Sequence, residues 1–400
     1  MLSLTERPKI ISEMAGQKSV LQFMKESSRD MEYPPFMLFY GASGIGKSTL
    51  AFILAKTVNC KNPIKNPEGF YDPCNECKSC QDVNEARFGR DIHYMDASKM
   101  GKAEVSQLSG ITNRLPMYDK KRVIIIDEAH LLNSKEARGA MLLILEKPID
   151  SVLFILCTTD ISKFDNAFMN RLQKFKFRAI DTGSIGSYLG KLFNQQIALW
   201  DKEGKDLGND GIEYNGQLIN PDKLESFAKE VIPLIAFNSQ GALRQALQYY
   251  EQCVKMFLFT KEEVLEALDF FDQERADTIM LDILNIQNTG EVYEYLKTSD
   301  ISMFYNYLYK TVQESFILQN TGYMAEPSRD YLYQKFIGNP NLQELFRTLL
   351  YIEENKIGYN MNSRYIISRL LQFMFENQPS NVKPQKLEED NNSRKRVVRR

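Results

Sequence analysis

Residues 41–48 constrain the fold of this chain more than any other stretch. They read Gly-Ala-Ser-Gly-Ile-Gly-Lys-Ser, the spacing of a phosphate-binding loop. An apolar run at 36–40 predicts a buried strand before the loop, and apolar residues spaced by three and four from Leu50 to Val58 predict a helix after it. Glycines let backbone N–H groups approach phosphate oxygens, and the helix N-terminus adds partial positive charge. The order strand, loop, helix therefore predicts a site for a nucleoside triphosphate.

Each residue of this loop has an expected role. Lys47 is expected to reach the outer phosphates, and the Ser48 hydroxyl is expected to hold Mg²⁺. A glycine-rich turn that binds nothing would not explain why both flanking elements are present. The other residues expected to surround the nucleotide are Gly41, Ala42, Ser43, Gly44, Ile45, Gly46 and Thr49.

Two carboxylates follow a second predicted strand. The β-branched run at 122–126 is typical of a buried parallel strand, and Asp127 and Glu128 come directly after it. Ligands of open α/β sheets bind beyond the carboxyl ends of the strands. Asp127 is therefore expected to contact Mg²⁺ and Glu128 to polarise the attacking water, unless the strand end is acidic by chance.

Residues 127–130, Asp-Glu-Ala-His, also form a string found in RNA helicases. Those enzymes need a second motor domain with its own arginine motif, and the helical pattern after residue 180 offers none. His130 is expected to pack or to form hydrogen bonds rather than to catalyse.

Four of the six cysteines lie within a short window, Cys60, Cys74, Cys77 and Cys80. In a reducing compartment such a cluster favours a metal site, and four thiolates suit tetrahedral Zn²⁺. A zinc deaminase signature would need an upstream His-x-Glu, but the two histidines lie downstream. An iron–sulfur run would need a further cysteine where the chain has Asn84. Four unrelated free thiols are the remaining alternative to structural zinc.

Bulk properties exclude several classes of protein. A chain of 400 residues is expected to form two or three domains, and 43% hydrophobic with 26% charged residues is ordinary for a globular protein. No apolar run is long enough to span a membrane, and the N-terminus has no secretory signal, so a cytoplasmic location is expected. The formal net charge is −2, so nucleic acid would have to meet a local basic face or helix N-termini.

The alternation of predicted strands and helices up to about residue 180 indicates an α/β domain with a parallel sheet. Its expected range is 1–180, with the cysteine module inserted as a loop at 60–81. Helical segments are expected at 181–258, interrupted by a loop or hairpin at 201–221, and at 259–376, where Thr260 and Glu263 form a capping box. The polar end at 377–400, which closes in Arg399-Arg400, is expected to be a disordered tail.

Three weaker signals complete the set. Thr158-Thr159 ends a strand expected to lie beside the Asp127 strand, Asn170-Arg171 precedes the next strand, and Arg244 lies in the stretch 241–246 that opens a helix. Each of them alone is ordinary.

Taken in this order, these residues resemble the bacterial DNA polymerase III γ/τ subunits, the clamp-loader ATPases of the AAA+ class. The likeness extends over about residues 5–270, and the zinc insertion is a particular mark of that family. It implies an AAA+ domain, a helical lid at 181–258 and a collar at 259–376 that holds a ring of subunits. Because a long τ-like extension is not expected after the collar, the resemblance is to the short γ form, from a bacterium or a bacteriophage.

The resemblance also implies roles for single residues. Thr158 or Thr159 would be sensor 1, Arg244 the sensor 2 arginine, and Arg171 the finger that enters the ATP site of a neighbouring subunit. Arg7-Pro8 and Gly16-Gln17 look like the nucleotide-contact segment of the family. The sequence departs from the family in two places, at Asn170 and Leu172 on either side of Arg171, and at Ala242 and Gln245 near Arg244.

ATP, Mg²⁺ and Zn²⁺ are the implied cofactors. The implied partners are other loader subunits, the sliding clamp and primer–template DNA, without a membrane. Two alternatives remain, namely another AAA+ ATPase that remodels DNA and a non-catalytic scaffold subunit of the loader.

Overall fold

The computed structural model describes residues 7–132, 135–203, 205–206, 211–214, 216–324, 329–355 and 363–378. The chain divides into two compact units, residues 1–268 and residues 269–400. The boundaries expected at 180 and 258 stay predictions, and all but two residues of the expected tail lie outside the described residues.

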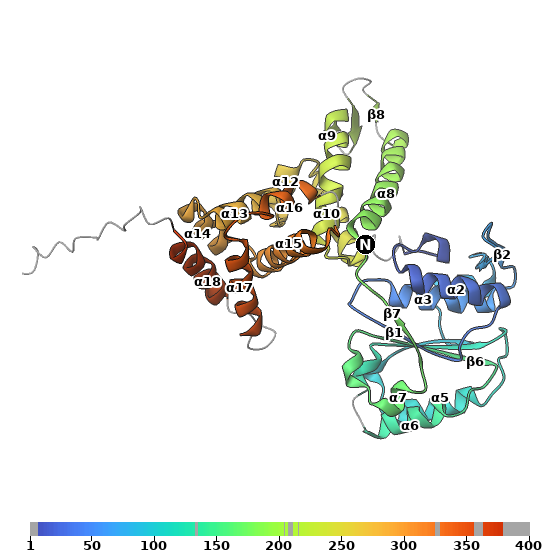
Figure 1. The fold of residues 1–400 in the computed structure, drawn as a ribbon. Coiled ribbons are helices and arrows are strands. Elements are labelled where there is room, and N and C mark those ends of the chain that lie inside the picture. The colour runs from blue at the N-terminus through green and yellow to red at the C-terminus, as the bar shows by residue number, and fades with distance from the viewer. Residues whose placement is uncertain are drawn as a thin grey trace, which may run out of the picture. The chain divides into compact units, whose positions relative to one another are not determined.

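The first unit is built on a five-stranded parallel sheet, as the sequence predicts (Figure 1). Its order is β4-β5-β6-β1-β7, so the strand before the phosphate loop lies between two strands from later in the chain. The register pairs Asp96 with Asp127 and Tyr40 with Thr158, which brings the ends of four strands to one edge. The strands are β1 Phe36–Tyr40, β4 Ile92–Asp96, β5 Arg122–Asp127, β6 Val152–Thr158 and β7 Gln173–Lys176.

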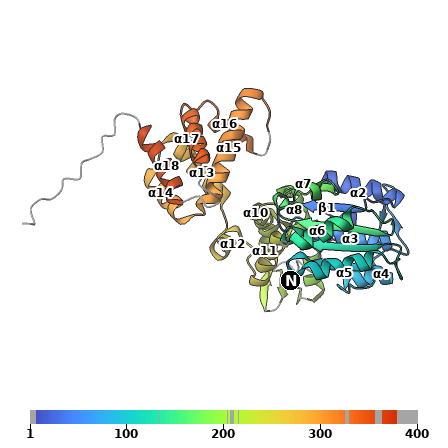
Figure 2. The same ribbon diagram turned by 90° about the horizontal axis from the view of Figure 1, so that it is seen from below.

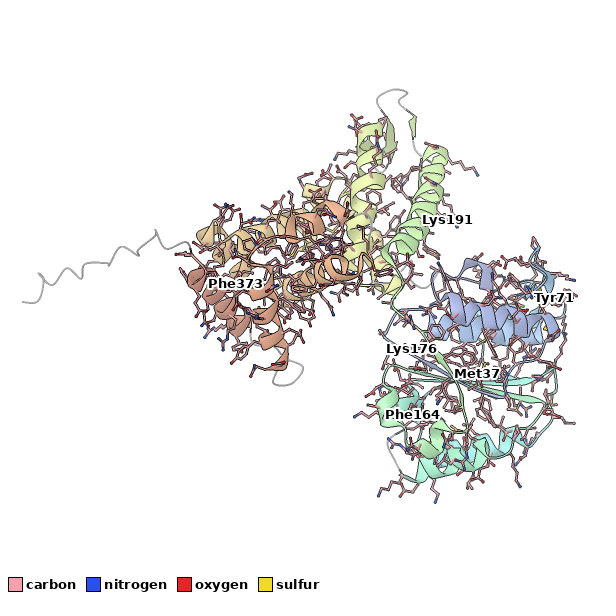
Figure 3. The ribbon with its side chains drawn as sticks, in the orientation of Figure 1. Met37, Tyr71, Phe164, Lys176, Lys191 and Phe373 are labelled. Carbon is pink, nitrogen blue, oxygen red and sulfur yellow. The ribbon has the colours of Figure 1, made fainter. Side chains whose placement is uncertain are left out.

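Helices cover both faces of this sheet, because successive strand residues point to opposite faces. Met37, labelled in Figure 3, and Phe39 pack on the side of α2 and α3, whereas Leu38 packs on the side of α5 and α6. Figure 1 shows the two layers above and below the strands. The helices and short turns are α2 Lys18–Asp30, α3 Lys47–Asn59, α5 Lys102–Thr112, α6 Lys135–Leu145 and α7 Asn166–Met169, with 3₁₀ turns at Ile11–Glu13, Ala97–Lys99, Ala129–Leu131 and Ile161–Lys163.

The cysteine module follows α3. The sequence predicted a loop at 60–81, but the chain forms a small antiparallel hairpin and then a helix that continues to residue 84. Proline and glycine in this stretch indicated a loop. The hairpin and the helix were not predicted because both are short and lack a clear hydrophobic period. The elements are β2 Ile64–Lys65, β3 Tyr71–Asp72 and α4 Lys78–Asn84.

The rest of the first unit is helical around an aromatic core. The rings of Phe193, Trp200, Phe227, Tyr250 and Phe259 are fully buried and contact one another. The expected hairpin is confirmed by β9 and β10, and the capping box by Glu263 N–H donating to Thr260 Oγ1 (3.3 Å). The elements are α8 Thr182–Glu203, β8 Lys205–Asp206, β9 Ile212–Tyr214, β10 Gln217–Ile219, α9 Pro221–Ser226, a π-helical turn Phe227–Val231, α10 Ile232–Asn238, α11 Leu243–Met256 and α12 Lys261–Leu268.

Every element of the second unit that the structure describes is an α-helix. The longest, α15, packs against α16, α17 and α18 (Figure 2). Asp277 accepts hydrogen bonds from Tyr307 and Tyr331 inside this bundle. No helix among the described residues is long and apolar enough to cross a lipid bilayer. The helices are α13 Gln273–Asn285, α14 Thr289–Thr298, α15 Ile301–Thr321, α16 Asp330–Phe336, α17 Leu342–Glu354 and α18 Ser363–Glu376.

Candidate nucleotide and metal sites

The predicted phosphate loop joins β1 to α3 and depends on its glycines. Gly44 and Gly46 have φ angles of 75° and 102°, in the left-handed region that favours glycine. A Cβ atom on Gly41 would lie 2.4 Å from the carbonyl oxygen of Phe177, so a larger residue would displace the neighbouring backbone. The loop therefore wraps tightly at the N-terminus of a thirteen-residue helix, where backbone amides favour an anion.

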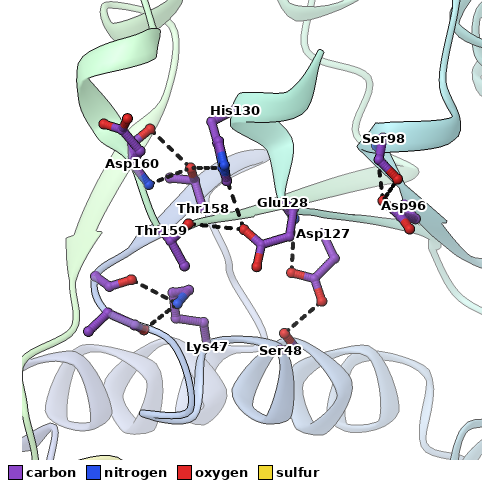
Figure 4. Close-up of polar contacts among 12 residues, drawn as sticks. Lys47, Ser48, Asp96, Ser98, Asp127, Glu128, His130, Thr158, Thr159 and Asp160 are labelled. Atoms are coloured by element: carbon purple, nitrogen blue, oxygen red, sulfur yellow. Dashed lines mark hydrogen bonds and ion pairs between the residues drawn. The ribbon is translucent and has the colours of Figure 1, made fainter. Parts of the chain in front are cut away.

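Lys47 is buried at the start of α3 and donates to two carbonyl oxygens of the loop itself, those of Gly41 (2.8 Å) and Ala42 (2.6 Å) (Figure 4). Burial lowers the pKa of Lys47, while the nearby carboxylates of Glu128 and Asp127 act in the opposite direction. A buried ammonium held by neutral acceptors alone is a ready partner for phosphate oxygens.

One carboxylate oxygen of Asp127 accepts hydrogen bonds from two hydroxyl groups. Ser48 Oγ donates to Asp127 Oδ2 (2.9 Å), and Tyr94 Oη donates to the same oxygen (2.9 Å). The pairing of Ser48 with Asp127 joins residues 79 positions apart, and Figure 4 shows the contact. A serine hydroxyl and a carboxylate are ligands that suit Mg²⁺, so the two predicted ligands fit such an ion.

Glu128 stands beside this pair with a φ of 46°, an uncommon value for a residue with a side chain. Thr159 Oγ1 donates to Glu128 Oε2 (3.2 Å), and His130 Nδ1 lies 3.4 Å from the same oxygen. Thr158 is fully buried and its hydroxyl lies 3.1 Å from His130 Nδ1. His130 thus forms hydrogen bonds, as the sequence predicted, and of the two threonines Thr159 faces the carboxylate.

The pocket above the loop has walls from three parts of the first unit. Arg7, Pro8, Met14 and Ala15 form one wall. Ile180 and three residues of α11 form the other, and the backbone N–H of Arg244 donates to the carbonyl of Gly44 (3.2 Å). The residues that line this pocket besides the loop, Asp127 and Glu128 are Arg7, Pro8, Met14, Ala15, Ile180, Leu243, Arg244 and Leu247.

Two arginines meet in this pocket. Burial is the main cause that lowers the pKa of Arg7, and the positive charge of Arg244 lowers it further. Arg7 is half-buried and Arg244 is exposed, and the two positive charges repel each other. Phosphate oxygens bound near both guanidinium groups would relieve that repulsion. The charge of the pocket therefore favours a polyanionic ligand.

Arg171 is not among the residues that line the pocket. Its guanidinium donates to the carbonyl of Ala167 (2.6 Å) and pairs with Glu146 (3.1 Å), and about a third of the side chain is exposed. The structure thus places Arg171 on the surface of its own unit, where a neighbouring chain could reach it.

The four predicted zinc ligands come together. Their sulfur atoms all lie within 4.8 Å of one another, and all four are free thiols. Four sulfurs around a zinc ion with Zn–S bonds of about 2.3 Å would be about 3.8 Å apart, so the cluster fits zinc with small shifts. Burial raises the pKa of Cys74, but backbone N–H groups of Cys77 and Glu76 outweigh it and lower that pKa to about 7. A thiol of this kind readily becomes the thiolate that binds metal.

Sequence reasoning missed Tyr94 and the apolar walls of the pocket. Tyr94 carries no motif, because an aromatic residue in the middle of a strand such as β4 is ordinary. Met14, Ile180 and Leu247 read as ordinary core residues, since the loop that they face is far away in the sequence.

The fold and site define the class first: this is a P-loop nucleotide-binding protein with a parallel sheet and a helical segment that contacts the loop. The profile of a protein family described as "DNA polymerase III, delta subunit" matches residues 16–181. In sequence the chain is similar to the γ/τ-like clamp-loader subunits of DNA polymerase III.

The relatives differ in how much they share with this chain. It is 25% identical over 312 residues to DNA polymerase III subunit gamma of Buchnera aphidicola subsp. Baizongia pistaciae, covering 77% of this chain and 75% of the relative. It is 34% identical to DNA polymerase III subunit gamma/tau of Mycoplasma pneumoniae, covering 46% of this chain but only 26% of that relative.

Among solved structures, the Holliday junction branch migration motor RuvB of Thermotoga maritima is 19% identical. The match covers 71% of this chain and 80% of RuvB, with a TM-score of 0.43. That similarity is too low to assign a function.

Proposed function

We propose that this chain is the ATP-hydrolysing subunit of a sliding-clamp loader for a replicative DNA polymerase. The observation that carries the proposal is the convergence of Ser48 and Asp127, 2.9 Å apart, at the start of the helix that follows the glycine-rich loop. ATP binding would open the clamp and load it on primed DNA, and hydrolysis would release it. A cytoplasmic location follows from that role.

Each residue of the site has a chemical task in this proposal. Lys47 would exchange its two carbonyl partners for phosphate oxygens, and Arg244 would reach the γ-phosphate from α11. Glu128 would orient the attacking water, with Thr159 holding the carboxylate in place. Mg²⁺ held by Ser48 and Asp127 would neutralise charge that develops on the phosphate oxygens.

The site is incomplete without a neighbour in this proposal. Arg171 would enter the ATP site of the adjacent subunit, and an arginine supplied in trans makes hydrolysis depend on assembly. The collar expected at 259–376, whose helices lie mostly in the unit 269–400, would hold the subunits together. Primer–template DNA would be held mainly through its phosphates, so binding should weaken as salt rises.

An ATPase assay with clamp and primed DNA, added separately and together, tests the proposal. We expect the assembled loader to hydrolyse ATP fastest when both are present, and Glu128→Gln to bind ATP without turnover. Stimulation by DNA alone would favour a different DNA-remodelling motor. A wild-type chain that binds no ATP, in a loader that works, would identify a scaffold subunit.

Cys60, Cys74, Cys77 and Cys80 would hold one structural Zn²⁺. We predict that Cys77→Ser loses the zinc that mass spectrometry finds in the wild-type protein. Cys253→Ser, a change of a buried cysteine in α11, should keep it. A brown, iron-rich preparation would contradict the zinc assignment.

A further inference from the structure

The N-terminal wall of the nucleotide pocket is one short segment, residues 7–15. Its two ends line the pocket, with Arg7 and Pro8 at one and Met14 and Ala15 at the other. The fit at the second end is close, because a Cβ atom on Gly46 would lie 3.0 Å from Met14 Cε. The position of residues 9–12, between the two ends, therefore sets the shape of this wall.

Lys56 links this segment to the cysteine module through hydrogen bonds. It lies on α3 and is 2% exposed. Its ammonium donates to the carbonyl of Lys9 (2.9 Å), to Asn75 Oδ1 (2.6 Å) and to Asn84 Oδ1 (2.9 Å). All three donors of the ammonium thus have an acceptor, as burial of a charged group requires. Asn75 lies between two of the clustered cysteines, and Asn84 ends α4.

Asp72 makes the second connection. This buried carboxylate in β3 lies two residues before Cys74. Its Oδ1 accepts the backbone N–H of Ile11 (2.8 Å), and its Oδ2 accepts the hydroxyl of Ser12 (2.7 Å). The same hydroxyl accepts from Asn66 Nδ2 (2.9 Å), which also belongs to the module. Hydrogen bonds to a charged acceptor are among the stronger ones in proteins.

The cysteine cluster determines the positions of Asn75 and Asp72. Cys74 N–H and Cys77 N–H donate to the sulfurs of Cys60 and Cys74 (both 3.3 Å), so the backbone on either side of Asn75 follows the sulfur cluster. A change in the cluster would therefore move Asn75 and Asp72, and with them residues 9–12.

We propose that the cysteine module holds the N-terminal wall of the nucleotide pocket, with Lys56 and Asp72 as positioning residues. This inference rests on the proposed nucleotide site and adds to it a structural dependence of nucleotide affinity on the module.

The test compares three variants with wild type in the 400-residue protein. Lys56→Met removes the ammonium group with its three hydrogen-bond donors. Asp72→Asn removes the negative charge of the carboxylate that accepts hydrogen bonds from Ile11 and Ser12. Lys25→Met is the matched control, because Lys25 pairs with Glu68 of the module (2.7 Å) from α2 and does not contact the segment. Measured quantities are the affinity for a fluorescent ATP analogue, the zinc content, and hydrogen exchange of the peptide that covers residues 7–15.

We expect Lys56→Met and Asp72→Asn to weaken nucleotide binding by about tenfold, the factor that one hydrogen bond to a charged group represents. Hydrogen exchange of residues 7–15 should rise and zinc content should stay at the wild-type level. Lys25→Met should match wild type in all three. If a variant fails to fold, Ser12→Ala serves instead, since this exposed hydroxyl supplies one bond to Asp72 and should give a smaller loss.

Unchanged affinity in both variants, or an equal loss in Lys25→Met, would overturn the inference. A wild-type protein that bound no nucleotide would overturn the proposed function instead. In that case hydrogen exchange would still decide whether the module holds the segment.

Discussion

The candidate metal site depends on Asp127. The side chain of Asp127 is held by a partner, Tyr94, that belongs to no sequence motif. Tyr94 donates to the same carboxylate oxygen as Ser48, and its ring packs against Phe52 and Phe88 with centroids 5.3 and 5.4 Å away. Burial, and after it the charge of Asp127, raise the pKa of Tyr94, so the hydroxyl keeps the proton that it donates. The aromatic cluster thus fixes the orientation of a metal ligand.

Tyr94→Phe should weaken the affinity of the ATP-bound protein for divalent metal by about tenfold, because it removes a hydrogen bond to a charged group. Binding of Mn²⁺ followed by electron paramagnetic resonance measures the effect. Tyr118→Phe, which changes an exposed tyrosine, is the control. Equal metal affinity in Tyr94→Phe and wild type would show that the orientation of Asp127 does not depend on Tyr94.

Arg171→Ala should leave ATP binding near the wild-type level and lower hydrolysis by the assembled loader about 10³-fold or more, as expected for an arginine supplied in trans. The isolated chain should be unaffected, since Arg171 does not line its own pocket. Arg29→Ala, another surface arginine paired with a glutamate, is the matched control. A parallel loss of ATP binding would assign Arg171 a different role.

At the scale of elements, a buried ion pair joins the starts of two strands. Asp91, 1% exposed, lies before β4 and pairs with Arg122 of β5 (2.8 Å). Its other oxygen accepts the backbone N–H groups of Met117, Tyr118 and Asp119. This one carboxylate therefore fixes the connection between α5 and β5, and with it the strand that carries Asp127.

Asp91→Ala should lower the free energy of unfolding by about 3–5 kcal/mol near pH 7, because it leaves Arg122 buried without its partner. Burial raises the pKa of Asp91, but the bonds from Tyr118 and Arg122 outweigh it and the pKa is lowered overall. A lowered pKa gives stability that is present above the unfolded value and lost as pH falls through the folded value.

The stability difference between Asp91→Ala and wild type should therefore shrink below about pH 4, near the usual pKa of aspartate. Urea denaturation at neutral and acidic pH measures it. The exposed Asp201→Ala on α8 should change stability by less than about 0.5 kcal/mol at either pH. A difference that is the same at both pH values would contradict the role given to the carboxylate charge.

At the scale of the whole molecule, the two units differ in which candidate sites they contain. Every residue that lines the candidate nucleotide pocket belongs to residues 1–268. The unit 269–400 contains only helices among its described residues and none of the predicted ligands of nucleotide or metal. The candidate nucleotide site thus belongs to one unit, and assembly is the task proposed for the other.

A fragment of residues 1–268 should fold and bind ATP with nearly the affinity of the 400-residue chain. It should not enter the loader, and clamp with primed DNA should not stimulate its hydrolysis. Equilibrium titration and analytical ultracentrifugation measure the two properties. A fragment that still assembled would show that the helical unit is not the collar.

Short spacings in the sequence were enough to predict the phosphate loop, the acidic strand end and the four thiolates. These features depend on contiguous backbone: Gly44 and Gly46 need their own φ angles, and Cys74 and Cys77 approach each other through a short turn. The parallel sheet was predictable for a similar reason, since buried strands have a hydrophobic pattern of their own.

Only the tertiary structure decided which residues complete the site that begins at Gly41. It distinguished Thr159, which faces Glu128, from the buried Thr158, and it brought Tyr94 to Asp127 and Lys56 to Lys9. Such contacts join segments far apart in the chain, and no local periodicity encodes the distance between them. The sequence by itself determined the chemistry of the loop, and the packing of remote segments around it decided its walls and its supports.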